Sequence, residues 1–203
     1  MDYKELNHSR RSIHFFDTEK KVEVDLLKEI INEAVLAPSA FNLQPWSIIA
    51  VKSEEGKKRL HEACKQPKVL EAPVTLVMIG NPLGYRRDNP MWEVKKENGM
   101  KEEQISGMID FCESSLYFNE VKKNAMAVRN TSLFAMNIMA SAQNLGVHTH
   151  PMIGFDEDKV KEIFSIEKEK TVVMLICVGY LKDGKVLNPR EKRRTYDDIV
   201  TEV

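Results

Sequence analysis

A run of three residues near the N-terminus has the chemistry of a phosphate-binding site. Arg10 and Arg11 are adjacent, and Ser12 follows them directly. Arginine carries forked N–H donors with a permanent positive charge, and serine adds a short hydroxyl donor, so the run suits a phosphate dianion. Basic pairs near a chain terminus are also common as plain solvent-exposed stretches, and the run taken alone favours that simpler interpretation.

A polar loop further along the chain can present hydrogen-bonding groups to a flat heteroaromatic ring. From Ala37 to Trp46 it reads Ala-Pro-Ser-Ala-Phe-Asn-Leu-Gln-Pro-Trp, which offers backbone groups and two side-chain amides. The alternative is an ordinary connection between a helix and a strand. Under both interpretations we expect Trp46 to anchor the loop in the core, because burial of its large ring is strongly favourable.

Apolar periodicity predicts the helices and strands that must position these runs. Helices are predicted over residues 25–37, 54–64, 102–114, 121–145 and 156–164, and strands over 47–51, 73–79 and 171–181. We expect Asp25 to cap the first helix and Gly146 to end the long one. The pattern indicates an α/β or α+β layered fold, and the long gap before the last strand argues against a doubly wound sheet. The chain has no glycine-rich dinucleotide turn and no P-loop motif.

The composition indicates a single domain over residues 1–203, with no bias toward nucleic acid or membranes. Hydrophobic residues make up 42% and charged residues 30%, which is a soluble globular profile. A net charge of -1 gives no overall attraction to nucleic acid or to an anionic membrane. No apolar stretch approaches the ~20 residues of a membrane helix, and the N-terminus lacks the apolar part of a secretory signal. The three cysteines have neither disulfide nor zinc spacing, so a reducing cytoplasm is the simplest location.

Several motifs, in order along nearly the whole chain, resemble those of the nitroreductase family of flavoproteins. The two most specific are R-R-S-x-x-x-F, which begins at Arg10, and A-P-S-A-x-N-x-Q-P-W, which begins at Ala37. Weaker agreement comes from the segments Glu-Ala-Pro at 71–73, Asn-Leu-Gly at 144–146, Ile-Gly-Phe-Asp at 153–156 and Val-Gly-Tyr at 178–180. With these motifs present, phosphate binding becomes the favoured interpretation of the N-terminal arginines.

The resemblance implies an α+β fold with a central, mostly antiparallel sheet flanked by helices, in a homodimer that binds FMN at its interface. It implies an enzyme that uses NADH or NADPH to reduce nitroaromatics, quinones or related organic acceptors by ping-pong transfer of hydride through flavin N5. The flavin carries the electron chemistry, so no protein acid, base or nucleophile is assigned. The alternatives are a reductive dehalogenase or flavin-consuming enzyme on the same scaffold, which residues 81–120 would decide, and a non-catalytic FMN-binding protein.

The resemblance also implies cofactor-binding residues at the matching positions. Contacts to the FMN phosphate and ribityl chain are implied for Arg10, Arg11, Ser12 and, from the C-terminal basic run, Lys192 and Arg193. The loop that the partner subunit would lay against the flavin corresponds to Pro38, Ser39, Ala40 and Asn42. The backbone N–H groups that would face flavin N5 correspond to Ile153 and Gly154.

Two positions depart from the family pattern. His14 stands where relatives often have arginine or lysine near the pyrimidine edge of the flavin. A neutral histidine there would stabilise a reduced, anionic flavin less than a fixed cation does. Lys65, next to Gln66, stands where relatives often have asparagine, and we expect it to replace part of the missing positive charge.

Two further groups of residues have competing interpretations. His148 and His150 would share one side of a strand, as metal ligands do, but no third ligand is spaced nearby, so metal binding is the weaker interpretation. Four aromatic residues of the irregular middle region form either the core of an excursion or the wall of an acceptor site. They are Tyr85, Trp92, Tyr117 and Phe118.

Overall fold

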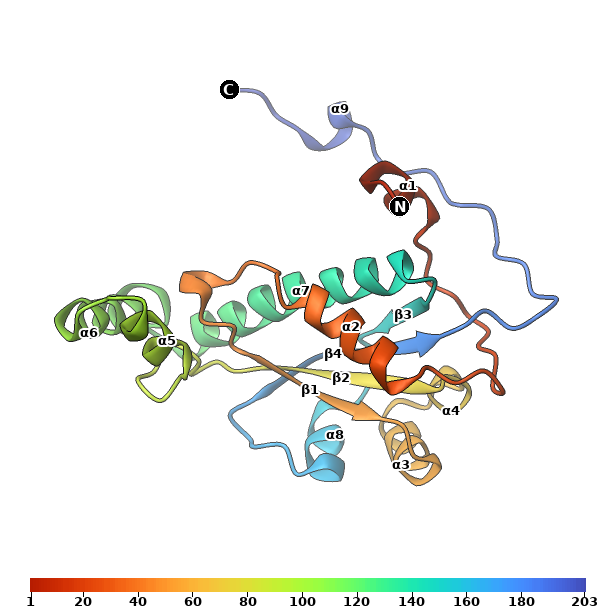
Figure 1. Ribbon diagram of the computed structural model, residues 1–203, viewed down its shortest axis with the longest axis horizontal. Helices are drawn as coiled ribbons and strands as arrows, with labels where there is room; N and C mark the ends of the chain where they lie inside the picture. Colours follow the sequence, from red (N-terminus) through yellow and green to blue (C-terminus); the bar gives the residue numbers. More distant parts are fainter.

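A four-stranded antiparallel sheet lies at the centre of the protein, as the computed structural model of residues 1–203 shows (Figure 1). The strands are β1 (Trp46–Val51), β2 (Val74–Gly80), β3 (His148–Met152) and β4 (Thr171–Gly179), in the spatial order β1-β2-β4-β3. All three strand pairs are antiparallel. The α+β class with an antiparallel central sheet is thereby confirmed.

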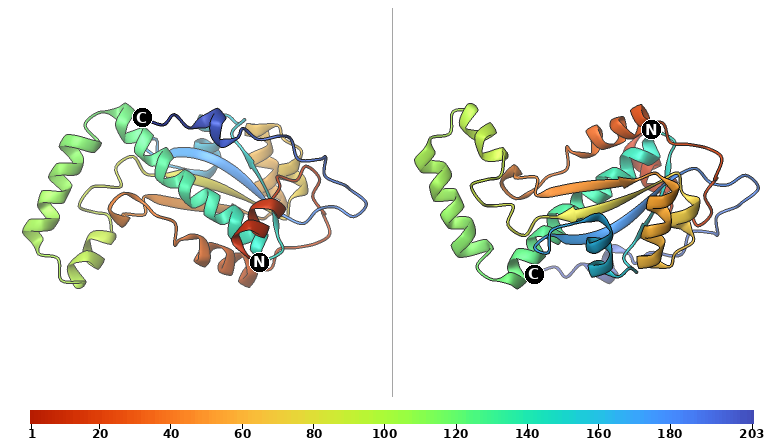
Figure 2. Two further views of the ribbon diagram at one scale, coloured as in Figure 1. Left: turned by 90° about the horizontal axis from the view of Figure 1, so that it is seen from above. Right: turned by 90° about the horizontal axis from the view of Figure 1, so that it is seen from below.

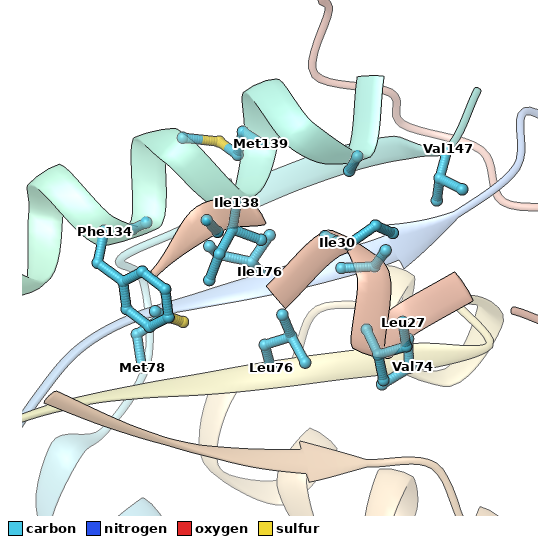
Figure 3. Packing of buried hydrophobic residues seen from close by; sticks show 14 of the residues in the cluster. Leu27, Ile30, Val74, Leu76, Met78, Phe134, Ile138, Met139, Val147 and Ile176 are labelled. Atoms are coloured by element: carbon cyan, nitrogen blue, oxygen red, sulfur yellow. The ribbon is translucent and has the colours of Figure 1, made fainter. Parts of the chain in front are cut away.

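Helices cover both faces of this sheet (Figures 1 and 2). One face carries α2 (Val24–Ala34) and α7 (Glu120–Asn144), and the other carries α3 (Glu54–Cys64), α4 (Lys68–Glu71) and α8 (Glu157–Phe164). Every residue of β2 is buried, because side chains that alternate along the strand enter two different cores. Leu76 and Met78 join the core under α2 and α7, which Figure 3 shows, whereas Val77 joins the core on the opposite face.

The α2 helix is shorter than its sequence pattern predicts. Its buried face is formed by residues at helical spacing, Leu27, Ile30 and Ala34. It ends at Ala34 rather than at residue 37, because the last turn tightens: the Ala37 amide donates to the Ala34 carbonyl, three residues back, before Pro38. Asp25 lies in the first turn and is not the cap, since Glu23 occupies the cap position.

The α7 helix is the long element that spans one face of the sheet. It begins after Asn119, whose side chain accepts a hydrogen bond from the Lys122 amide at 2.9 Å. It ends at Asn144, and Gly146 adopts a φ of +74°, as the predicted C-terminal glycine should. The helix crosses so close to β2 that a Cβ added to Gly80 would meet atoms of Thr131 and Ala127 at 2.9 to 3.1 Å. Only glycine fits at this position of the strand.

The middle region forms an excursion with a small core of its own. It contains α5 (Met91–Glu97), α6 (Glu102–Phe111) and a π-helical turn (Cys112–Leu116). Its six buried residues are Leu43, Tyr85, Trp92, Ile105, Cys112 and Tyr117. The Trp92 ring N–H donates to the carbonyl of Tyr85 at 3.1 Å and to that of Arg86 at 3.0 Å. Three of the four aromatics left open by the sequence are therefore core residues, and Phe118 alone is exposed.

The sequence pattern did not predict strand β3, and its composition explains why. The strand is short and polar, and it contains Pro151, which has no N–H for a ladder. Its place at the edge of the sheet tolerates a proline, because one side of an edge strand has no partner.

The N-terminal segment lies at the end of the sheet away from the excursion, whereas the last residues run back toward the excursion, so the two termini lie well apart (Figure 2). Helix α1 (Tyr3–Ser9) is capped by Asp2, whose side chain accepts a hydrogen bond from the Glu5 amide at 2.8 Å. After β4 the chain runs as an extended segment that holds only the short α9 (Tyr196–Ile199), and no residue beyond Gly179 is buried (Figure 2). The end of the sheet opposite α1 carries the excursion and the one-turn helix η1 (Ala40–Asn42). None of the helices has both the length and the apolar character needed to cross a bilayer.

We predict that Ile30→Ala lowers the free energy of unfolding by about 2–5 kcal/mol, because Ile30 is fully buried between α2 and the sheet and its truncation leaves a cavity. Urea unfolding of the flavin-free protein measures the change. Val24→Ala on the same helix is the control, since Val24 is 54% exposed and should cost less than about 0.5 kcal/mol. Equal losses for the two variants would contradict this description of the core.

Candidate functional site

A cavity lined by arginines lies where the N-terminal and C-terminal segments meet. Its volume is about 240 Å³, and its lining contains no hydrophobic residue. The lining residues are Arg10, Arg11, Ser12, His14, Asn188, Pro189, Arg190, Glu191 and Arg193. Five residues that the sequence implied for the cofactor are thus brought together, although they come from opposite ends of the chain. Lys192 does not line the cavity, whereas Arg190 and Asn188, which sequence reasoning missed, do.

Pairing with strand β3 holds the N-terminal half of this cavity in place. Ser12 forms a parallel bridge with Thr149, and the Ile13 amide donates to the Thr149 carbonyl at 3.1 Å. The Ile13 side chain is fully buried in the core beneath α3 and α8. A second bridge joins Phe16 to Leu181 and so directs the C-terminal segment past the same edge of the sheet. The cavity is therefore fixed beside the edge strand β3 and the end of its neighbour β4.

The charge in the cavity is strongly positive and is not neutralised within the chain. Burial lowers the pKa of the Arg10 guanidinium below its usual value, and the neighbouring charges of Arg190, Arg193 and Arg11 lower it further. None of the protein's ion pairs involves any of these four arginines. Four arginines outnumber the single lining carboxylate of Glu191, so the net positive charge favours the binding of an anion, and forked guanidinium donors match a phosphate group.

Two histidines extend the site from the cavity along β3. The rings of His14 and His150 meet edge to face, with their centroids 4.9 Å apart. Burial lowers the pKa of His150 to about 4, and the charges of Lys68 and His14 act in the same direction. The Nδ1 atoms of His148 and His150 are buried and have no hydrogen-bond partner in the chain. No group of three His, Cys, Asp or Glu side chains is arranged to hold a metal ion.

The end of α3 brings further basic residues to the same region. Lys65 follows the helix in a left-handed conformation, with φ 53°, and its side chain is exposed beside Gln66. The Asp156 amide donates to the Ala63 carbonyl at 2.9 Å, which places the end of α3 beside the loop that follows β3. Neither Lys65 nor Gln66 lines the arginine cavity. Lys68, which sequence reasoning missed, lies close enough to His150 to affect its pKa.

The loop after β3 offers free backbone donors. Ile153 is 80% exposed, and a Cβ on Gly154 would meet no atom within 4 Å, so the backbone there is open to a ligand. Neither the Ile153 nor the Gly154 amide donates a hydrogen bond within the chain. Ile153 is four residues beyond Thr149, which corresponds to roughly 13 Å along an extended strand. An elongated ligand with a phosphate at one end can therefore reach from the arginine cavity toward these amides.

The polar loop at residues 38–45 lies at the other end of the sheet. The Ala40 amide donates to the Asn130 side chain at 2.9 Å, and Phe41, Asn42 and Gln44 all have positive φ angles. The loop enters β1 at Trp46, which pairs with Gly80 at one end of β2. Trp46 stacks on Phe134 at 4.7 Å, so its predicted role as an anchor is confirmed.

The strand registers give the separation between this loop and the cavity. Thr149 pairs with Val178, which pairs with Val74 at the start of β2, whereas Trp46 pairs with Gly80 at its end. Six residues of strand between these positions span roughly 20 Å. One copy of the chain therefore does not bring Pro38, Ser39, Ala40 and Asn42 to its own arginine cavity.

Known proteins share this architecture over nearly the whole chain. The family model described as the Nitroreductase family matches residues 8–180. MhqN of Bacillus subtilis (strain 168), named as a proposed NAD(P)H nitroreductase, is 32% identical over 98% of each chain. The crystal structure of ydfN from Bacillus subtilis, described as a proposed nitroreductase, superposes with a TM-score of 0.91 at 32% identity over 99% of this chain and 98% of that one. A proposed nitroreductase of Exiguobacterium sibiricum, solved in complex with FMN, gives a TM-score of 0.87 at 26% identity over 100% and 98% of the two chains.

The antiparallel sheet, the helices on both of its faces and the arginine cavity at its edge define an α+β protein suited to a phosphorylated ligand. The match over residues 8–180 and the relative at 32% identity then make the assignment specific: the chain belongs to the nitroreductase family.

We predict that wild-type protein loses more stability than His150→Gln as the pH falls from about 6.5 toward about 4. The unfolded histidine takes up a proton near pH 6.5, whereas burial keeps folded His150 neutral down to a pKa of about 4, so the unfolded state binds more protons between these values. The stabilising effect of neutral His150 is therefore complete above the unfolded pKa and is lost as the pH drops.

Urea unfolding at about pH 7.5 and about pH 5 measures this effect. His8→Gln, which replaces an exposed histidine of α1, is the control and should follow the wild type. If His150→Gln loses as much stability as the wild type between the two conditions, His150 is not held neutral by the fold.

Proposed function

We propose that this protein is an FMN-dependent oxidoreductase that uses NADH or NADPH to reduce small organic acceptors such as nitroaromatics and quinones. One observation carries the proposal: a cavity with net positive charge lies beside β3, and two free backbone amides follow that strand, which is the arrangement that an elongated phosphorylated cofactor requires. Membership of the nitroreductase family and the FMN bound to the Exiguobacterium sibiricum neighbour support the same cofactor.

The residues of the site match the phosphate and the ring of FMN in charge and hydrogen-bonding character. Arg10, Ser12 and Arg193 would hold the phosphate, since they line the cavity and neither arginine forms an ion pair with a carboxylate. The free amides of Ile153 and Gly154 would donate to heteroatoms of the ring. His14 lines the cavity and meets His150, and Lys68, which lies near His150, would supply positive charge there.

Bound FMN would supply the redox chemistry, in which it takes hydride from the nicotinamide and passes it to the acceptor. The residues of the chain would anchor the phosphate of the cofactor and would orient and polarise its ring. Four arginines favour the dianionic phosphate and fix one end of the cofactor, which leaves the exposed Ile153–Gly154 backbone to set the position of the other end. No buried carboxylate or nucleophile lies in the cavity, so we assign no protein acid, base or nucleophile.

We infer that a second copy of the chain completes the site. The loop at residues 38–45 lies roughly 20 Å from the cavity along the sheet, beyond β1, and β1 and β3 are the two opposite edge strands, so we expect another molecule to bring this loop to the cofactor. The outer surface of α7 and the end of α2 expose apolar side chains that a monomer would leave in water. They include Leu36, Val128, Leu133 and Met136, which are 38% to 77% exposed.

The visible spectrum tests the cofactor directly. We expect purified protein, reconstituted with FMN, to show flavin bands that bleach on anaerobic addition of NADPH or NADH and return with a quinone or nitroaromatic. Protein that takes up no FMN would overturn the proposal. Bound flavin that neither nicotinamide reduces would identify a non-catalytic FMN-binding protein. Flavin that is reduced but not reoxidised by these acceptors would indicate a different acceptor, such as an organohalide.

We predict that Arg10→Gln weakens FMN binding by roughly 10- to 100-fold and leaves riboflavin binding unchanged. Loss of charge-assisted hydrogen bonds to the phosphate costs about 1.5–3 kcal/mol, and riboflavin has no phosphate to lose. Flavin fluorescence titration of the apoprotein measures both constants. Arg194→Gln removes the same charge from a side chain outside the cavity and should bind FMN like the wild type. Equal weakening of FMN and riboflavin would contradict a phosphate site at Arg10.

We also predict that two inactive variants restore activity to one another when they are mixed. Ala40→Trp would obstruct the loop, and Arg10→Gln would weaken the phosphate site. A mixed dimer in which the partner supplies the loop has one site with both parts intact. Refolding the two variants together, followed by an assay at limiting FMN, should recover part of the wild-type rate. A mixture that stays inactive would show that each chain uses its own loop, and a mass equal to one chain would exclude the dimer.

A further inference from the structure

The four arginines of the cavity differ in what their guanidinium groups contact. Arg190 Nη2 donates to the Arg10 carbonyl at 2.7 Å and to the His8 carbonyl at 3.2 Å. Arg11 Nη2 donates in the opposite direction, to the Asn188 carbonyl at 2.7 Å. The Arg193 guanidinium reaches only the carbonyl of Glu191 on its own segment. The Arg10 side chain makes no hydrogen bond within the chain, although its charge is surrounded by the other three.

Hydrogen bonds of Arg190 and Arg11 join the C-terminal segment, here residues 188–203, to the rest of the protein. From Asn188 to the C-terminus every residue is exposed, and no backbone hydrogen bond joins this segment to the sheet or to the helices. Leu187 is the last side chain that packs against a core. Beyond Asn188, both hydrogen bonds to the body of the protein come from Arg190.

The segment is therefore held without hydrophobic burial and against repulsion between like charges. Arg190 and Arg193 both carry positive charge toward Arg10 and lower its pKa. Without the carbonyl contacts of Arg190, no hydrogen bond would join the segment beyond Asn188 to the rest of the protein, and Arg193 would be repelled by Arg10 because no carboxylate pairs with either.

We propose that Arg190 is a positioning residue of the phosphate site: it fastens the C-terminal segment to the backbone at residues 8–10 and thereby holds Arg193 at the cavity. Arg11 assists from the other side through Asn188. Arg10 and Arg193 are then the arginines that face the ligand, and Arg190 acts on the ligand only through Arg193. This inference rests on the proposed binding of FMN, and it assigns different roles to arginines that the sequence presents as one basic set.

The variant Arg190→Gln tests the proposal in apoprotein titrated with FMN and, in parallel, with riboflavin. We expect FMN binding to weaken about tenfold or more, since the two carbonyl contacts and the ordered Arg193 are lost together. Riboflavin binding should stay as in the wild type. Trypsin should cut the segment beyond Asn188 faster in Arg190→Gln than in wild type, while the unfolding midpoint stays the same because no buried residue is involved. Arg194→Gln is again the charge-matched control.

A double-mutant cycle separates positioning from direct contact. If Arg190 acts through Arg193, then adding Arg190→Gln to Arg193→Gln weakens FMN binding no further than Arg193→Gln alone. Losses that add would show that Arg190 contacts the phosphate itself, and unchanged FMN affinity in Arg190→Gln would show that the fastening is dispensable. Either result overturns the inference. Failure of the proposed function is distinguishable, because wild-type protein would then bind no FMN at all.

Discussion

The arginine cavity depends on one local constraint, the pairing of residues 12 and 13 with strand β3. The buried Ile13 side chain and its amide contact with Thr149 fix the chain where it leaves α1. Arg10 and Arg11 precede this anchor directly, so their positions follow from it. The same path continues to Phe16, whose bridge with Leu181 directs the C-terminal segment back across the anchored residues. Two segments from opposite ends of the chain, both rich in arginine, therefore meet at one edge of the sheet despite their mutual repulsion.

That repulsion favours an anionic ligand in the cavity. A protein that only needed stability would pair such guanidinium groups with carboxylates, as its lysines elsewhere pair with glutamates. Here the arginines contact backbone carbonyls, which orient the guanidinium groups and leave the positive charge in place. The structure thus keeps a preorganised site for an anion, and the binding of a phosphate relieves the electrostatic cost of gathering the arginines.

The positive charge along β3 is weaker than that of the arginine cavity. His14, at the position where relatives often have arginine or lysine, contacts His150. Lys68 of α4 lies near His150 as well. Burial and neighbouring cations favour the neutral imidazole of His150. Lys65, which the sequence suggested as the compensating cation, is exposed at the end of α3, whereas Lys68 lies close enough to His150 to lower its pKa.

Much of the architecture could be predicted from the sequence, because local patterns determine it. The periodicity of α3 and α7, the apolar runs of β2 and β4 and the glycine after α7 each reflect a preference of a few neighbouring residues, and each element forms close to where it was expected. The arginine run and the polar loop also carry their chemistry in their own residue types. Strand β3 could not be predicted in this way, since its polar residues and Pro151 become a strand only by pairing with β4.

The site itself is a tertiary property. The sequence by itself determined which residue types were available, namely arginines at both ends, a histidine pair and a polar loop. Only the fold decided that the two ends share a cavity, that Lys68 lies beside His150, and that the loop lies at the far end of the sheet. These arrangements follow from which strands pair and in what register. Such contacts join residues far apart in the chain, and the free energy that selects them comes from burying β2 and β4 under helices on both faces, which no local spacing encodes.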